Sequence, residues 1–262
     1  MNIEEIVKVP YTTQPRMTRN VGDVFNPNPS EIYLEDKNRQ IHNFGYDLYG
    51  MNIPCITGKL IEKCESFLGK PITGDIVDFA MNFEEDVAIM HNGILSAICF
   101  CFPSSWIPFY GLNKTLEEVH QPVADGDHLR RVSSKLAKTM ADPVLGSFRR
   151  YVWTITKVPE LSNHPEIKKK YKKNDLTFDN LYFRLETQTT MPLKDGLTSL
   201  FFVKVEVFPL KQVWHTIILE SINSMTDAVL EYKNLKEIKI LLNEINDFEK
   251  AILKNEYYDI LD

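Results

Sequence analysis

The alternation of apolar and polar residues along the chain predicts a set of β-strands. Alternation sends successive side chains to opposite faces of a strand, and it is clear in three runs, at residues 150–158, 181–189 and 199–208. Two further apolar runs, 86–91 and 94–102, flank Asn92-Gly93, a dipeptide typical of two-residue hairpin turns. Five strands with short links predict an antiparallel sheet in an α+β fold.

Apolar residues spaced three and four positions apart predict the helices. A short helix over 56–68 ends at Gly69, and a helix over about 125–140 is inserted between the second and third strands, with Asp125 or Asp127 as its cap. After Pro209, two apolar stripes predict two helices that pack on the sheet or on each other. The first stripe consists of Val213, Ile217, Ile218, Ile222, Met225 and Val229, and the second of Leu235, Ile238, Leu241, Leu242, Ile245, Phe248 and Ile252.

Prolines punctuate the N-terminal part of the chain and predict its organisation. Because proline disfavours long helices and central strands, we expect residues 1–55 to be irregular and to wrap the domain or be loosely held. The central α+β domain is then expected over 56–212, with C-terminal helices over 213–262 packed on it. The prolines concerned are Pro10, Pro15, Pro27, Pro29 and Pro54.

Composition is that of an ordinary globular protein and excludes several classes. The 262 residues are 44% hydrophobic and 25% charged, which suffices for a packed core and argues against wholesale disorder. The formal net charge is -6, and the longest basic block is the short lysine cluster at 168–173, so nucleic acid is not an expected partner. The first ten residues lack an apolar signal segment, and we expect a cytoplasmic protein.

The uncharged stretch 94–112 has about the length of a membrane span. Two prolines, two serines and a glycine interrupt it, and a hairpin turn precedes it. We therefore interpret it as a buried strand followed by a turn, and we expect no membrane insertion.

Common catalytic signatures are absent from the sequence. It contains no G-x-G-x-x-G, P-loop, G-x-S-x-G or H-E-x-x-H motif, and no two histidines lie three or four residues apart. No C-x-x-C occurs, so structural zinc and iron–sulfur ligation are disfavoured. A triad assembled from distant residues leaves no such signature and stays open. The cysteines are expected to be reduced thiols, with Cys99 and Cys101 on one face of a strand; the other two are Cys55 and Cys64.

Two constellations carry candidate chemistry. His120 ends a short helix just before Pro122, where its ring either sits at the helix dipole or faces a pocket. Arg184, Glu186 and Gln188 share one side of a predicted strand and form either a solvated face or a polar wall. Trp106 and Trp153 are expected in the core.

Two blocks of sequence together resemble a known family. The first is P-S-x-W-x-P at 103–108 followed by V-H-x-P-V at 119–123, and the second is R-x-x-W at 150–153 followed by R-x-E-x-Q-T at 184–189. In this order, after the apolar hairpin, the motifs resemble the haem-dependent oxidative N-demethylase α-subunit family over roughly residues 20–215. The resemblance implies a PAS-like haem-binding domain, here 56–212, that acts as a monooxygenase on small alkylamines. It further implies O2 as oxidant and electrons from separate flavin and iron–sulfur reductase components, since this chain has no motif for either.

The sequence departs from the family's pattern at four positions. Gly111 and Asn113 stand where the family usually shows a lysine and a glycine. Val152 replaces the asparagine of R-x-N-W, and Thr187 replaces the second arginine of R-x-E-R-Q-T.

With the resemblance added, site roles can be assigned. Haem b needs an axial imidazole, an apolar slot and cations for two propionates, and His120 is the expected iron ligand, with His91 and His128 as the next choices. Residues 94–109 and the apolar run 201–203 are candidates for the slot. Candidates for further cofactor contacts are Arg130, Arg131, Arg149, Arg150 and Trp153.

The polar set of the predicted strand 181–189 is the expected catalytic group. The Glu186 carboxylate, flanked by Arg184 and Gln188, either pairs with Arg184 or waits for a cationic amine. The alternative function is a PAS-type module that senses gas or redox state through haem, or binds another ligand, without catalysis. The apolar C-terminal helices would then suit a homodimer.

Overall fold

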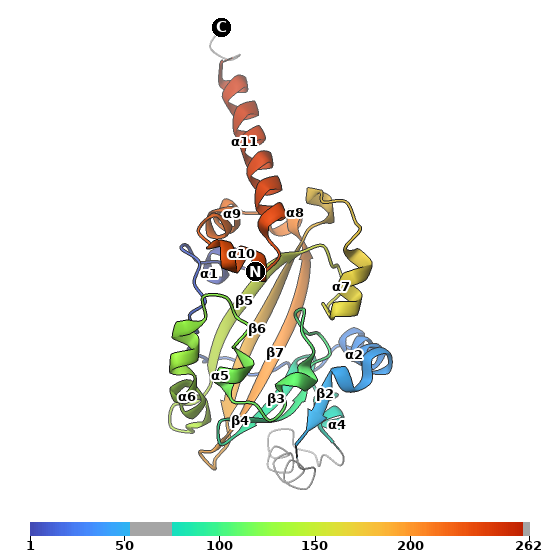
Figure 1. Ribbon diagram of the computed structural model, residues 1–262, viewed down its shortest axis with the longest axis vertical. Coiled ribbons are helices and arrows are strands. Elements are labelled where there is room, and N and C mark those ends of the chain that lie inside the picture. The colour runs from blue at the N-terminus through green and yellow to red at the C-terminus, as the bar shows by residue number, and fades with distance from the viewer. Residues whose placement is uncertain (53–74, 259–262) are drawn as a thin grey trace.

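A computed structural model describes residues 1–52 and 75–258, with side chains of the last helix described as far as 247. In this part of the chain, one antiparallel sheet of seven strands is flanked by helices (Figure 1), with strand order β1-β5-β6-β7-β3-β4-β2. The fold is thus α+β, as predicted. The strands are β1 (Thr18–Arg19), β2 (Tyr49–Met51), β3 (Asp86–His91), β4 (Ile94–Cys99), β5 (Phe148–Thr156), β6 (Tyr182–Pro192) and β7 (Thr198–Pro209).

The five predicted strands are present as β3 to β7, each within three residues of its expected ends. Asn92 and Gly93 both take positive φ, 52° and 77°, which the tight β3–β4 hairpin requires. The two edge strands, β1 and β2, were not predicted because two or three residues carry no readable alternation.

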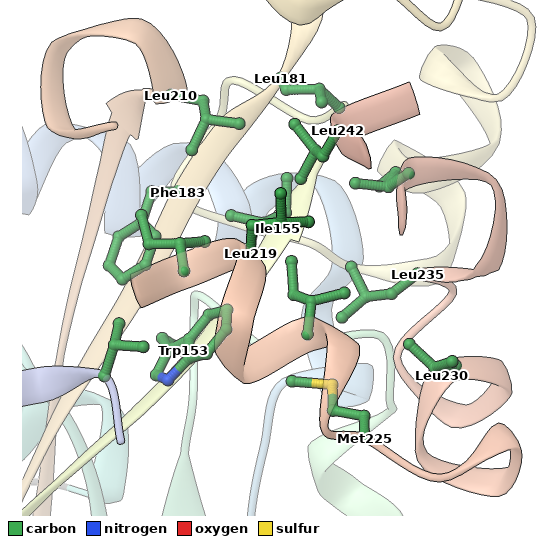
Figure 2. Close-up of a cluster of buried hydrophobic side chains, with 14 of the residues drawn as sticks. Trp153, Ile155, Leu181, Phe183, Leu210, Leu219, Met225, Leu230, Leu235 and Leu242 are labelled. Carbon is green, nitrogen blue, oxygen red and sulfur yellow. The ribbon is translucent and has the colours of Figure 1, made fainter. Parts of the chain in front are cut away.

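Alternation along the strands gives the sheet two different faces. Ala88, Met90 and Ile98 pack with Met140 of the inserted helix α6 (Asp127–Ala141). On the other face, Trp153 and Phe183 pack under the C-terminal helices (Figure 2). A third cluster fills the space beneath the short helix α4 (Ile76–Ala80).

The C-terminal segment contains more helices than the two predicted stripes suggested. It folds as α8 (Leu210–Val213), α9 (Thr216–Asn223), α10 (Asp227–Tyr232) and α11 (Lys236–Tyr258). Breaks occur where side chains cap new helices: His215 accepts from Ile217 N, and Thr226 accepts from Val229 N. α11 then extends away from the sheet (Figure 1).

The expectation of a wholly irregular N-terminal segment is wrong for α2 (Glu31–Phe44), a 14-residue helix. Pro29 lies just before its N-cap Ser30 and Pro54 lies well beyond its end, so the prolines bound a helix-length window. Outside α2, short elements such as α1 (Ile3–Ile6) alternate with extended chain. Val7 of this segment is fully buried in a cluster that includes residues of the C-terminal helices.

Neither predicted aspartate caps α6. Its N-cap is Gly126, where a Cβ would lie 2.7 Å from Val123 O, so only glycine fits without a shift. Asp125 instead takes a positive φ of 52° and accepts a bond of 2.6 Å from Thr226 Oγ1. Asp127 lies in the first turn of the helix.

The cysteine prediction is confirmed where it can be tested. Cys99 and Cys101 are buried free thiols whose sulfurs lie 3.9 Å apart on one face, within hydrogen-bonding distance of each other. The predicted 56–68 helix, Cys55 and Cys64 lie outside the described residues, as do the side chains of Phe248 and Ile252. None of the helices in the described ranges combines the length and apolarity needed to cross a bilayer.

Candidate functional site

A row of polar side chains crosses β5 and β6 on one sheet face. Arg150 lies opposite Gln188 in the β5–β6 register, and its Nε donates to Gln188 Oε1 at 2.7 Å. Gln188 Nε2 donates in turn to Glu186 Oε2 at 2.7 Å. The shared face predicted for Arg184, Glu186 and Gln188 is therefore observed, and the row is largely shielded from solvent, with Gln188 only 8% exposed.

Ser104, in the loop that follows β4, hydrogen-bonds to two residues of this row. The sequence marks it only as part of the P-S-x-W-x-P motif. Its hydroxyl donates to Glu186 Oε1 and accepts from Arg184 Nε at 2.9 Å. Ser104 belongs to P-S-x-W, so the signal for a site serine lay in that motif, but its partner is 82 residues away.

Arg184 is fully buried, and its guanidinium donates to backbone carbonyls instead of facing a cavity. Its Nη2 donates to Phe102 O at 2.6 Å and its Nη1 to Leu161 O. The nearest oxygen of Glu186 lies 4.0 Å away. Arg184 therefore compensates the carboxylate while fixing the two loops that border it.

Asp86 binds the backbone at the start of the loop that carries Ser104. Its two carboxylate oxygens accept from Cys101 N and Phe102 N, both at 2.8 Å. Burial raises the pKa of Asp86 to about 6, against lowering by Lys37 and these amides. The loop that carries Ser104 is thus fastened at several points.

Two further cations lie near Glu186. Burial lowers the pKa of Arg150, and the Glu186 charge opposes that shift. Burial likewise lowers the pKa of Lys233 to about 8, and Glu186 again opposes it. Lys233 Nζ donates to Trp153 O at 2.9 Å and lies 5.4 Å from the ring centroid of Tyr11. Lys233 and Tyr11 were missed because nothing in their local sequence marks them.

His120 lies on the same side of the sheet, at the C-cap of α5 (Leu116–Val119). Its Nδ1 is 2.7 Å from Leu116 O, which fixes the tautomer with the proton on Nδ1 and leaves a lone pair on Nε2. Burial, together with a smaller effect of the Arg150 charge, lowers the pKa of His120 to about 4, although the bond to Leu116 O opposes that shift. The imidazole is therefore neutral at pH 7, with no bond to Nε2 among the described residues.

Arg130 acts on the backbone around His120. Its Nη1 donates to His120 O at 3.4 Å, Gln121 O at 3.3 Å and Val123 O at 3.1 Å. Its Nη2 pairs with Asp127 at 2.5 Å. These bonds hold the backbone of residues 120–123 in place and use the hydrogen-bonding capacity of the Arg130 guanidinium.

The other predicted residues lie apart from this set. Arg131 and His128 are exposed on α6. His91 has both ring nitrogens engaged, Nδ1 with Thr198 Oγ1 at 2.9 Å and Nε2 with Asn92 at 3.1 Å. Trp153 stacks on Phe183 in the core of the opposite face, with centroids 5.6 Å apart. Arg149 donates to Asp23 O and Thr189 Oγ1, on the side away from Arg150.

A hollow of about 260 Å³ opens beside Tyr11. It is walled by the N-terminal segment, the start of α6 and the α9–α10 turn. Tyr11, which lines the hollow, also contacts the Trp153 ring edge-on at 6.4 Å and lies close to Lys233. Its lining includes Thr13, Asp125, His128, Met225 and Val229.

The donor set fits a haem iron better than a metal held by protein alone. A neutral imidazole with its proton on Nδ1 is the form that binds iron through Nε2, and Arg150 supplies a cation nearby. Within the described residues, no group of three His, Cys, Asp or Glu side chains is placed to hold a metal ion.

The sequence model of the haem-dependent oxidative N-demethylase α-subunit-like proteins matches residues 71–242 of the chain. The chain belongs to this family. The match confirms the resemblance and corrects its extent, because it reaches past residue 215 into α11 and begins only at 71. Among curated proteins, none matches.

The structure explains one of the two departures from the family pattern before His120. Asn113 takes a left-handed φ of 64°, a conformation that asparagine tolerates better than other residues with a Cβ. The turn that leads to α5 therefore survives without the family's glycine. At Gly111 a Cβ would lie 3.1 Å from Leu95 Cδ2 and 3.2 Å from Trp106 Cζ3, so a lysine here would require these side chains to move.

The other two departures lie on opposite faces of the sheet. Val152 pairs with Glu186 across β5 and β6, so the family's asparagine would stand directly beside the carboxylate. Thr187 points to the other face, where it lines a separate hollow. Of these two, only Val152 changes the lining of the site, by making it less polar.

Proposed function

We propose that this protein is a haem-dependent monooxygenase that removes an alkyl group from nitrogen, or oxidises the nitrogen, in a small amine. Family membership supports haem-dependent oxidative N-demethylase-like chemistry. The observation that carries the proposal is His120: neutral, with Nδ1 on a backbone carbonyl, on the sheet face that carries Glu186.

His120 would hold the iron through Nε2, with Arg130 keeping its loop in place. Arg150 is the cation best placed to meet a propionate, because its charge acts on both His120 and Glu186. When bound, haem supplies the site for O2 activation. Haem b is the expected form, since the sequence has no C-x-x-C-H for covalent attachment.

Glu186 would receive the ammonium group of the substrate. A carboxylate offers four acceptor positions, and Ser104 and Gln188 occupy one on each oxygen. The remaining positions suit a cationic amine, while Ser104 and Gln188 hold the carboxyl plane in a fixed orientation. Arg184 is a positioning residue for this arrangement.

The overall reaction for an N-methyl amine consumes two electrons, which must come from outside this chain. The methyl carbon gains one oxygen atom of O2, its C–N bond breaks, and the products are the dealkylated amine and formaldehyde. The second oxygen leaves as water after taking two electrons and two protons. A separate flavin and iron–sulfur reductase would supply those electrons, in the cytoplasm, to a domain that we propose is PAS-like.

Haem titration tests the ligand. The full chain is mixed with haem and followed by its Soret band and by a pyridine haemochrome assay. We expect His120→Ala to lose most of the haem or to change the spectrum, while His128→Ala, an exposed control, behaves as wild type. Equal haem content and equal spectra in both variants would overturn the assignment of His120.

Amine turnover then separates an enzyme from a haem-based sensor. Haem-loaded protein with a reductase and dimethylamine should consume the amine and release formaldehyde. Haem binding without any turnover across a series of small alkylamines would favour the sensor.

Glu186→Gln is expected to keep the fold and the haem but to weaken substrate binding, because the neutral amide lacks the charge that attracts an ammonium group. A rise of about tenfold or more in the amine dissociation constant is expected for loss of one charge-assisted bond. The exposed control Glu117→Gln on α5 should leave amine binding unchanged. Normal amine affinity and turnover in Glu186→Gln would mean that the carboxylate is structural only.

A further inference from the structure

The one basic block of the sequence forms a surface patch on α7 (Pro165–Tyr171) and the turn that follows it. The α7 lysine patch consists of Lys168, Lys169, Lys170, Lys172 and Lys173. All but Lys168 are exposed. In a chain of net charge -6, five lysines within six positions make a local field opposite in sign to that of the whole molecule.

Few acidic groups offset this charge. Glu166 pairs with Lys169 at 2.5 Å, and Glu160 is turned toward Tyr171 and Arg39. Asp175 follows the patch along the chain. Lys170 and Lys173 make no salt bridge to any residue within 1–52 or 75–247.

The turn that carries the patch is ordered by a sixth lysine. Lys157, from the end of β5, donates to Lys172 O at 3.0 Å and to Asn174 O at 2.9 Å. The half-buried Lys157 ammonium thus holds the backbone of the turn that carries the exposed lysines, and the patch has a defined shape.

The patch is bonded to the loop that carries Ser104. Lys168 Nζ and Asn163 Nδ2 both donate to Ser105 Oγ at 3.2 Å, and Ser105 N donates to Asn163 O at 3.0 Å. Ser105, next to the residue that binds Glu186, takes a left-handed φ of 66°. Leu161, just before this segment, accepts from Arg184. A protein docked on α7 would therefore sit against the outer side of the site loop.

We propose that the α7 lysine patch is the docking surface for the acidic face of a one-electron donor protein. The proposal rests on the proposed function, which requires electrons from outside this chain. Encounters between redox proteins use small interfaces and electrostatic steering, so a patch of this size suffices. Its contacts with the Ser104 loop would bring the donor to the side of the sheet that bears Arg184 and Glu186.

The test compares two double variants that change the net charge equally. Lys170→Glu with Lys173→Glu reverses the patch, and Lys135→Glu with Lys138→Glu reverses exposed lysines on α6, which lies at the left of the molecule in Figure 1 while α7 lies at the right. The probe is an oxidised, acidic plant-type [2Fe–2S] ferredoxin, titrated into the haem-free full chain at low and at physiological ionic strength.

Wild type should bind the ferredoxin with an affinity that falls as salt rises. The α7 variant should lose about tenfold or more in affinity or association rate at low salt, within the range of electrostatic steering, and the α6 variant less than about twofold. Circular dichroism checks that both variants are folded. The proposal is overturned if both variants weaken binding equally, if ferredoxin does not bind wild type, or if only anionic vesicles or DNA bind the patch.

The binding experiment needs no haem, so its outcome is independent of the proposed function. If the protein does not bind haem but the α7 variant binds ferredoxin more weakly than wild type, the docking surface is supported and the proposed enzyme function is wrong. The opposite result is that haem-loaded protein turns over amine and ferredoxin reduces the α7 variant as fast as wild type. In that case the proposed enzyme function is supported and the docking surface is wrong.

Discussion

Glu186 and His120 lie on the same side of the sheet but differ in their hydrogen bonds and in the charges near them. Glu186 accepts bonds from Ser104 and Gln188 and lies 4.0 Å from the Arg184 guanidinium. His120 is kept neutral by burial and by Arg150. A carboxylate with free acceptor positions and a neutral imidazole thus lie on one side of the sheet.

The lowered pKa of His120 predicts a pH dependence of folding. Between pH 6.5 and about 4 the unfolded chain binds a proton at His120 that the folded chain does not, so stability falls as the pH falls through that window. Lowering the pH from 7 to 5 should cost wild type about 2 kcal/mol more than it costs His120→Gln, which cannot take up that proton. Urea unfolding of both proteins at the two pH values measures this, and identical pH profiles would contradict it.

Arg184 predicts a large stability effect at a single residue. Arg184→Met would leave Phe102 O, Leu161 O and the Glu186 charge without their partner, at a cost of about 3–5 kcal/mol. Arg131→Met, at an exposed position on α6, should change stability by less than about 0.5 kcal/mol. Chemical denaturation measures both, and a small effect at Arg184 would show that the loops hold without it.

At the scale of elements, the segment between β4 and α6 positions the predicted ligand. It runs through the 3-10 turn Pro108–Gly111, the left-handed Asn113 and the capped helix α5 before it reaches His120. Thr115 and Glu118 form a capping box at the start of α5. A four-residue helix is marginal alone, so its place depends on these turns and on Arg130.

Asn113 allows the turn to be tested directly. Asn113→Gly should be neutral or slightly stabilising, because glycine adopts φ of 64° freely, whereas Asn113→Ala should cost about 1 kcal/mol. Thermal unfolding of the three proteins should show a higher melting temperature for the glycine variant and wild type than for the alanine variant. An alanine variant as stable as wild type would show that the turn relaxes at no cost.

At the scale of the whole molecule, the core joins the two ends of the chain to the sheet. One hydrophobic cluster contains Val7 from the N-terminal segment, Trp153 and Phe183 from the sheet, and Leu219 and Leu242 from the C-terminal helices (Figure 2). The three predicted segments 1–55, 56–212 and 213–262 therefore share one core along β5 and β6. We infer that they fold as a single cooperative unit.

A chain of residues 56–212 alone tests that inference. It lacks the helices that cover Trp153 and Phe183, and exposing several large apolar side chains costs roughly 2 kcal/mol each. We expect it to be unfolded or aggregated at 25 °C by circular dichroism and gel filtration, while the full chain melts in one transition. A stable 56–212 fragment with a sharp melting transition would establish an independent central domain.

The amino-acid sequence by itself determined the features that depend on neighbours along the chain. Strand alternation, the Asn92-Gly93 hairpin, the inserted helix and the shared face of Arg184, Glu186 and Gln188 follow from local periodicity, which the backbone geometry of a strand or helix enforces. The motifs around Trp106, His120 and Glu186 also indicated the family before the fold was known. The proline-bounded helix α2 was missed because prolines mark where a helix ends better than whether one forms.

Only the tertiary structure decided which of these residues meet. Ser104 and Arg184 are 80 residues apart, and Lys233 approaches Trp153 from the C-terminal helices. Arg130 donates to backbone carbonyls that the fold brings to it. His120 is neutral because it is buried and because Arg150 of another element lies near it. Solvent exclusion and Coulomb interactions depend on distance in space rather than along the chain, so no local pattern could have revealed them.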